Sequence, residues 1–176
     1  MADSRPTLAS LEMQPYLIDG ELPSGLAGKV GIYAIFDEAK ALQYVGYSRD
    51  VSVGLTQHLV RCPQQCHWFK YYTVARPSRT LLDEIRNAWL TEYGTVPPGN
   101  SDRQLAWEKP IDAKVFMTAD ERDAIANAEP SQTNKLLKQL ARRVEADVKA
   151  QVEARGAQIA IKFNPKLKEQ GVLALK

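Results

Sequence analysis

The sequence predicts an α/β fold of the α+β type, with a small sheet, flanking helices and a C-terminal helical extension. Two strand-like runs lie on either side of a polar turn in residues 30–45, which is typical of a β-hairpin. Two stretches with apolar residues at helical spacing then alternate with a third strand-like run at residues 69–75. A long amphipathic pattern over residues 131–155 follows, so the predicted order is β-β-α-β-α and then helix.

The predicted hairpin carries two tyrosines beside glycines. Residues 30–36 are β-branched and aromatic, and a second apolar run follows the turn at residues 42–45. Tyr33 ends the motif GIY and Tyr44 begins the motif YVG. Two half-buried sheet tyrosines that perform no chemistry are one interpretation of this pattern, so the rest of the chain must decide.

Two helices are predicted after the hairpin. Residues 49–61 carry apolar side chains at helical spacing, and Pro63 closes that segment. Residues 80–93 repeat the pattern, and Gly94 follows the last periodic residue, as expected at a helix end. These helices and the three strands place the predicted sheet domain at residues 30–100.

The two ends of the chain are predicted to form a lead-in and an extension. Residues 1–29 combine scattered apolar residues with a Pro/Gly-rich run, which suggests a short helix and a turn. Within residues 101–176 we expect a strand at 114–117, a short helix opened by Thr118 and Asp120, a long helix at 131–155, an edge strand at 157–163 and a loosely held end at 166–176.

Charge and composition limit the classes of partner. The net charge is +2 and the pI about 8.5, which is too weakly basic for a dedicated nucleic-acid coat. The helix 131–155 has a local basic excess, with six Lys and Arg residues against three acidic ones. This face could contact a phosphate backbone or a protein partner, although a solvated cover for the sheet is the plainer interpretation. No run reaches the roughly 18 apolar residues of a membrane span, and we expect a cytoplasmic protein.

Two cysteines lie four residues apart, too few for a secreted disulfide framework, which favours a reducing compartment. His58, Cys62, Cys66 and His67 together suggest zinc, but they lack the paired CxxC spacing of structural zinc sites. A redox role for Cys62 and Cys66 is a further alternative.

The motifs follow one ordered pattern: GIY at 31–33, YVG at 44–46, His58, Glu84 in the second helix and Asn100 after a Pro-Pro loop. This order resembles the GIY-YIG nuclease family over roughly residues 28–100. The segments YVGYSRDVSV, WLTEYG and VPPGN resemble more narrowly the nuclease-type domain of chloroplast monothiol glutaredoxins and of separate cyanobacterial proteins. A cyanobacterial cytosol or an equivalent plastid stroma is the location that this resemblance implies.

The resemblance implies a central antiparallel sheet and hydrolysis of DNA with one Mg²⁺ or Mn²⁺ ion. Glu84 would bind the metal, because a hard hydrated cation takes its other ligands from water and phosphate. Tyr33 and Tyr44 would position and deprotonate the attacking water, and His58 would orient a tyrosine hydroxyl. The loop and strand anchors would be Asn100, Gly31 and Gly46.

One position departs from the family pattern. The family has an arginine eight residues after the glycine of the second motif, and this sequence has Gly54 there. Losing a cation that stabilises a phosphate typically costs on the order of 10² to 10³ in rate. Arg49, at the start of the first helix, is the candidate substitute.

Two hypotheses for function follow. In the first, the chain is a metal-dependent DNA nicking endonuclease that uses Tyr33, Tyr44, His58, Arg49 and Glu84. In the second, it is a catalytically degraded GIY-YIG-like module that binds nucleic acid or a protein partner, the latter through helix 131–155.

Overall fold

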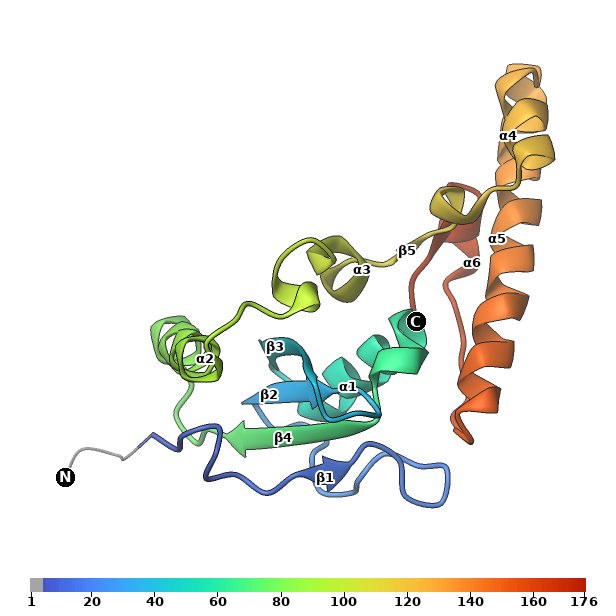
Figure 1. Ribbon diagram of the computed structural model, residues 1–176. Coiled ribbons are helices and arrows are strands. Elements are labelled where there is room, and N and C mark those ends of the chain that lie inside the picture. The colour runs from blue at the N-terminus through green and yellow to red at the C-terminus, as the bar shows by residue number, and fades with distance from the viewer. Residues whose placement is uncertain (1–4) are drawn as a thin grey trace.

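A four-stranded antiparallel sheet forms the centre of the molecule, in a computed structural model that describes residues 5–176 (Figure 1). Its strands are β1 (Gln14–Pro15), β2 (Gly31–Phe36), β3 (Leu42–Ser48) and β4 (Trp68–Thr73), in the order β1-β4-β2-β3. Helices flank this sheet, and a helical extension follows it, which confirms the predicted fold class.

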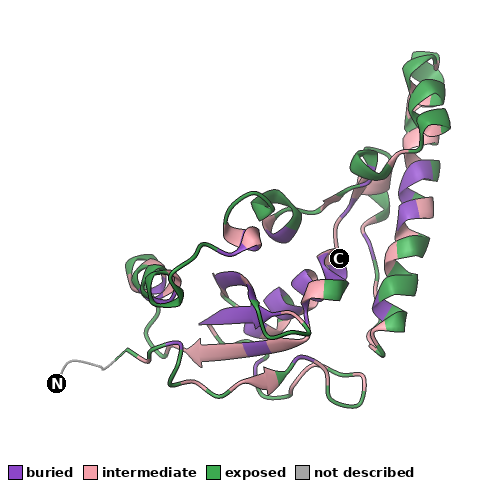
Figure 2. Cartoon of the chain, viewed as in Figure 1, coloured by how far each residue is buried: buried purple, intermediate pink, exposed green. Residues whose placement is uncertain are grey.

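The predicted hairpin is strands β2 and β3. In their antiparallel register Tyr33 pairs with Gly46, and Ile35 pairs with Tyr44. β4 pairs with the other edge of β2, so β2 is central and all of its residues are buried (Figure 2). Because successive side chains of a strand point to opposite faces, this register places both tyrosines on one face of the sheet.

Helices α1 (Val51–Arg61) and α2 (Arg79–Tyr93) cover opposite faces of the sheet. The buried residues of α1 pack with Tyr33 and Ile35 of β2, whereas those of α2 pack with the alternate β2 residues. The Asp50 side chain caps α1 by accepting from the Val53 N–H, and Ser78 caps α2 in the same way. Gly94 ends α2 with φ of 92°, a left-handed conformation that glycine adopts without strain. Both predicted helices are thus confirmed.

The lead-in differs from the prediction. Within residues 5–29 there is no helix, and β1 instead adds a fourth strand at the edge of β4. Tyr16 is fully buried next to β1, and its hydroxyl donates to the Leu55 carbonyl oxygen of α1 at 2.5 Å. The prediction of a short helix was wrong because contacts distant in sequence fix this segment.

After α2 the chain forms η2 (Pro98–Asn100), α3 (Gln104–Glu108), β5 (Ile111–Asp112) and η3 (Ala113–Phe116). The predicted strand at 114–117 is therefore wrong. The Asp112 side chain accepts from the Lys114 N–H and starts a 3₁₀ turn, which leaves Val115 and Phe116 exposed. Helix α3 was not predicted from the sequence.

The C-terminal extension contains α4 (Ala119–Ala126), α5 (Pro130–Ala154), α6 (Pro165–Lys168) and β6 (Val172–Leu173). The predicted short and long helices are confirmed, and Thr118 opens α4 with a capping box. Residues 157–163 alternate in burial as expected but form no strand, and one isolated bridge joins Phe163 to Leu175.

The last residues are held firmly, contrary to the prediction of a loose end. β6 pairs with β5, and Leu173 is 2% exposed in a core with Leu140 and Val144 of α5. Val60 of α1 belongs to the same core, so the extension packs on the end of α1. None of the helices in residues 5–176 has the length and apolar character that a membrane crossing requires.

Leu173→Ala is expected to lower the free energy of unfolding by about 2–4 kcal/mol, because it leaves a cavity between β6 and α5. Denaturant unfolding measures this change. Leu105→Ala is the matched control, since Leu105 is 75% exposed and its loss should change stability by less than about 0.5 kcal/mol. Equal stabilities of the two variants would show that the end of the chain is not part of the core.

Candidate functional site

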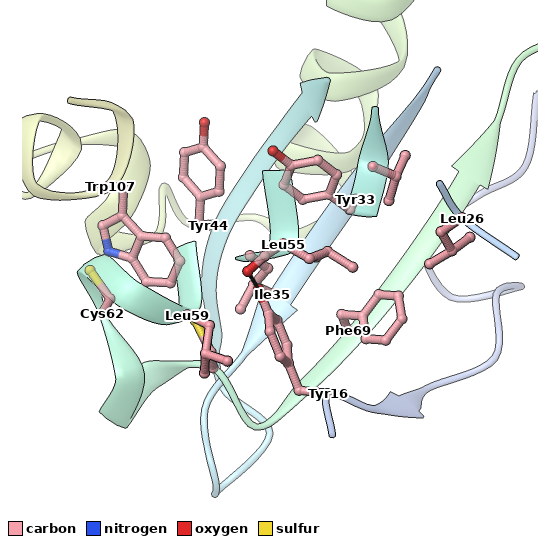
Figure 3. Packing of buried hydrophobic residues seen from close by; sticks show 12 residues of the cluster. Tyr16, Leu26, Tyr33, Ile35, Tyr44, Leu55, Leu59, Cys62, Phe69 and Trp107 are labelled. Carbon is pink, nitrogen blue, oxygen red and sulfur yellow. Dashed lines mark hydrogen bonds between the residues drawn. The ribbon is translucent and has the colours of Figure 1, made fainter. Parts of the chain in front are cut away.

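Three of the sequence-predicted side chains meet on the α1 face of the sheet, and we call Tyr33, Tyr44 and His58 the tyrosine cluster. The Tyr33 hydroxyl lies 2.9 Å from Nε2 of His58 and shares a hydrogen bond with it. The Tyr44 ring centre lies 4.7 Å from that of His58 and 6.4 Å from that of Tyr33. Figure 3 shows the two tyrosine side chains next to each other, with the Tyr33 hydroxyl on the side of its ring that faces Tyr44.

Glycines make room for both rings. A Cβ atom at Gly46 would lie 2.5 Å from the Tyr44 ring, and one at Gly54 would lie 2.7 Å from the Tyr33 hydroxyl. At Gly31, a Cβ would lie 2.6 Å from the Tyr72 carbonyl oxygen of the neighbouring strand. The glycines of the two motifs therefore serve close packing within the protein.

Burial makes the tyrosines weak acids. It raises the pKa of Tyr33 well above its ordinary value, and the positive charge of Arg61 only partly opposes this rise. Burial also raises the pKa of Tyr44, with further increases from the negative potential of Tyr33 and Glu108. Both phenols are consequently neutral near pH 7, which is unfavourable for a base that must deprotonate water.

His58 is neutral as well. Burial and, to a smaller extent, the nearby charge of Arg61 lower its pKa to about 3. The Trp107 carbonyl has a weak opposing effect on this pKa, but Nδ1 forms no hydrogen bond of normal geometry with any described residue. His58 is 4% exposed, so its one established polar contact is the Tyr33 hydroxyl.

Three residues of the site were not predicted. The Tyr44 hydroxyl donates to Glu108 Oε1 at 3.1 Å. The Trp107 ring stacks on the Tyr44 ring, with 5.2 Å between the two ring centres (Figure 3). Arg61 donates from Nη1 to the Trp107 carbonyl oxygen at 2.9 Å. Trp107 and Glu108 come from α3, whose sequence has no motif, whereas Arg61 follows Gly54 and His58 at helical spacing and was open to prediction.

Asn100 ties η2 to the hairpin. Its Oδ1 accepts from the Val45 N–H and its Nδ2 donates to the Val45 carbonyl oxygen, both at 2.8 Å. A Cβ at Gly99 would lie 2.6 Å from the Gln43 carbonyl oxygen, so the loop passes very close to β3. Asn100 therefore anchors the η2 loop to β3, the strand that carries Tyr44.

The structure does not bring Glu84 to the tyrosine cluster. Glu84 lies on α2, which covers the opposite face of the sheet from the two tyrosines. Its carboxylate is half-exposed and forms an ion pair with Arg5 of the N-terminal segment. A metal ion bound at Glu84 would thus be separated from the tyrosines by the sheet.

Arg49 is also on the α2 side. It is exposed and lines a pocket of about 630 Å³ with Arg79 and Tyr47, next to the connection between β4 and α2. The cation whose charge acts on Tyr33 and His58 is instead Arg61. The role of Arg49 as a substitute for the arginine that Gly54 replaces stays a prediction.

Arginines gather around the β4–α2 connection. The pocket of Arg49 lies on one side of this connection, and on the other side a pocket of about 890 Å³ is lined by Arg5, Arg76 and Tyr72. We call Arg5, Arg49, Arg76 and Arg79 the arginine surface. Within residues 5–176, neither Arg49 nor Arg76 forms an ion pair, whereas Arg5 and Arg79 face Glu84 and Asp83.

The cysteines are buried thiols. Both are free, and burial raises the pKa of Cys62 to about 11 and that of Cys66 well above its usual range. Such thiols are poor nucleophiles and poor redox sensors near pH 7. Among the residues that the structure describes, no three His, Cys, Asp or Glu side chains are placed to hold a metal ion.

Comparison with known proteins gives one relative with a clear similarity. The chain is 31% identical over 104 residues to the bifunctional monothiol glutaredoxin-S16, chloroplastic, of Arabidopsis thaliana. The alignment covers 57% of this chain and 34% of that protein, so the chain spans about a third of the length of its relative. No family model matches the chain.

The contact between Gly54 and Tyr33 predicts a coupled effect on stability. Gly54→Ala gains about 1 kcal/mol of helix propensity but overpacks Tyr33, which typically costs about 1–3 kcal/mol. In a Tyr33→Phe background the closest atom is absent, so Gly54→Ala should be more favourable there by on the order of 1 kcal/mol. A double-mutant cycle from denaturant unfolding measures the coupling, and simple additivity would contradict the contact.

His58 predicts a pH dependence of stability. Its pKa is about 3 when folded and about 6.5 when unfolded, so the unfolded chain binds the extra proton between these values. Stability should therefore fall as the pH falls below 6.5, by on the order of 2 kcal/mol between pH 7.5 and pH 5. His58→Gln should remove most of this loss in urea unfolding, whereas His67→Gln, the matched control at a less buried histidine, should retain it.

Proposed function

We propose that this chain is a GIY-YIG-related module that binds the phosphate backbone of nucleic acid through the arginine surface. The order of the GIY and YVG motifs, His58 and Asn100 supports the family relationship. The similarity to glutaredoxin-S16 over 104 residues is consistent with the narrower resemblance. The observation that carries the binding function is the pair of arginine-lined pockets on either side of the β4–α2 connection.

Arginine suits this role physically. A guanidinium group binds phosphate oxygens through paired hydrogen bonds and releases counterions from the nucleic acid. Arg49 and Arg76 are exposed and have no carboxylate partner within residues 5–176, so binding a phosphate breaks no ion pair of theirs.

Polar contacts hold the pocket wall next to Arg49. The Tyr47 hydroxyl donates to Asp83 at 2.9 Å, and the Arg86 guanidinium lies 5.3 Å from the centre of the Tyr47 ring. Arg86 also forms an ion pair with Asp83 at 2.9 Å. This network joins β3 to α2 and fixes the surface on which a backbone would lie.

The tyrosine cluster supports binding over efficient hydrolysis. Its phenols are buried and have raised pKa values, and Gly54 leaves no cation at the family position. The arginine surface and the tyrosine cluster also lie on opposite faces of the sheet.

Metal-dependent nicking of DNA is the second candidate function. It is favoured by one observation, the assembly of Tyr33, Tyr44 and His58 into a single hydrogen-bonded and packed group. In this candidate Glu84 is the proposed ligand of Mg²⁺ or Mn²⁺. Its ion pair with Arg5 and its place across the sheet favour the binding function instead.

Binding is tested with a short labelled DNA duplex by fluorescence anisotropy at several salt concentrations. Arg49→Ala and Arg76→Ala are each expected to weaken binding by about tenfold near 0.1 M salt and to reduce the salt slope by about 1. Arg142→Ala on the basic face of α5 is the matched control. If only the α5 variant loses affinity, the long helix and not the arginine surface contacts the DNA.

Nicking is tested in the same preparation with supercoiled plasmid, in Mg²⁺, in Mn²⁺ and in EDTA. Under the binding proposal the plasmid stays supercoiled in all three conditions. Conversion to open circles that requires metal and disappears in Glu84→Ala would establish the second candidate.

A further inference from the structure

A cavity of about 280 Å³ lies where the C-terminal extension meets the sheet domain. Its walls come from the end of α1, from η1 (Pro63–Gln65) and from α5. Arg61 and Arg103 line it together with the amide side chains of Gln64 and Gln151. None of these four residues belongs to the arginine surface, so the cavity is a separate feature.

Arg61 has unused hydrogen-bonding capacity. Its Nη1 donates to the Trp107 carbonyl oxygen, and with the described residues it makes no other hydrogen bond and no ion pair. The only buried side-chain atom without a partner in residues 5–176 is Nδ1 of His58, so the remaining Arg61 N–H groups face accessible space. A half-buried guanidinium without a counter-ion strongly favours an anion beside it.

Arg103 adds a second positive charge from a different element. It precedes α3, is exposed, and forms no ion pair with any described residue. Arg103 and Arg61 both lower the pKa of Cys62, which also lines the cavity, although burial of the thiol has the larger effect. The two charges therefore converge on one cavity.

Two acidic side chains reduce this positive potential: Glu108, whose charge acts on Arg61, and Asp147. Asp147 of α5 lines the cavity, but its carboxylate is 61% exposed and pairs with Arg143 at 3.2 Å. Arg143 also pairs with Glu121, so Asp147 keeps a part of its negative charge, and two arginines face this one carboxylate among the residues that line the cavity. The balance at the cavity remains positive.

We propose that this cavity binds a phosphate group through Arg61 and Arg103, with Gln64 and Gln151 donating further hydrogen bonds. Two guanidinium groups match the several oxygens of phosphate, and amide N–H groups complete its coordination without adding charge. Either the free ion or the 5′-phosphate of a nucleotide can supply this group. This site does not depend on the proposed contact with nucleic acid.

The test is isothermal titration calorimetry of the full chain with inorganic phosphate and with a nucleoside 5′-monophosphate, at constant ionic strength. We expect one site per chain, and at least a tenfold loss of affinity in Arg61→Gln and in Arg103→Gln. Arg103 is exposed, so that variant decides the result if Arg61→Gln fails to fold. Asp147→Asn should bind more tightly, because it removes the opposing charge.

Control experiments distinguish free phosphate from a nucleotide as the ligand, and the cavity from the arginine surface as the binding site. The nucleoside without phosphate should not bind, and tighter binding of the nucleotide than of free phosphate would identify the nucleotide as the ligand. Arg142→Gln should bind as the wild type does, whereas Arg49→Ala reports any phosphate that is bound at the arginine surface. Absence of binding, or full affinity in Arg103→Gln with loss in Arg49→Ala, would overturn the site while leaving the arginine surface intact.

Discussion

The hydroxyl of Tyr33 occupies the space that a side chain at position 54 would need, and this contact sets how α1 lies on the sheet. Because Gly54 has no Cβ, the helix approaches β2 closely enough for His58, one turn later, to bond the same hydroxyl. A Cβ at position 54 would lie 2.7 Å from this hydroxyl, so an arginine there requires the Tyr33 side chain to shift. The close approach also explains the burial of the tyrosines and hence their raised pKa values.

The sheet divides the polar residues of the molecule into two groups. Alternation along β2 and β3 sends Tyr33 and Tyr44 toward α1, whereas Tyr47 faces α2. Glu84 and Arg49 are on the α2 side with the arginine surface. Residues that form one ordered motif in the sequence thus lie on opposite faces of the sheet.

The C-terminal extension covers the sheet domain and also contributes residues to a core that they share. α5 and β6 enclose Val60 at the end of α1, and the tail that composition suggested was loose closes this core. The same junction leaves Arg61 half-buried between the tyrosine cluster and a cavity. Arg61 therefore acts through its charge on the tyrosine cluster of the sheet domain and also lines the cavity that the extension helps to form.

The sequence by itself determined the elements whose patterns are local: the hairpin with its two tyrosines, the capped helices α1 and α2, and the long amphipathic α5. Through the family resemblance it also indicated that His58 orients a tyrosine hydroxyl, without saying which one. Only the tertiary structure decided that Glu84 lies across the sheet and that α3 brings Glu108 to Tyr44. These placements depend on contacts between segments distant along the chain, and hydrophobic period and turn chemistry carry no information about such contacts.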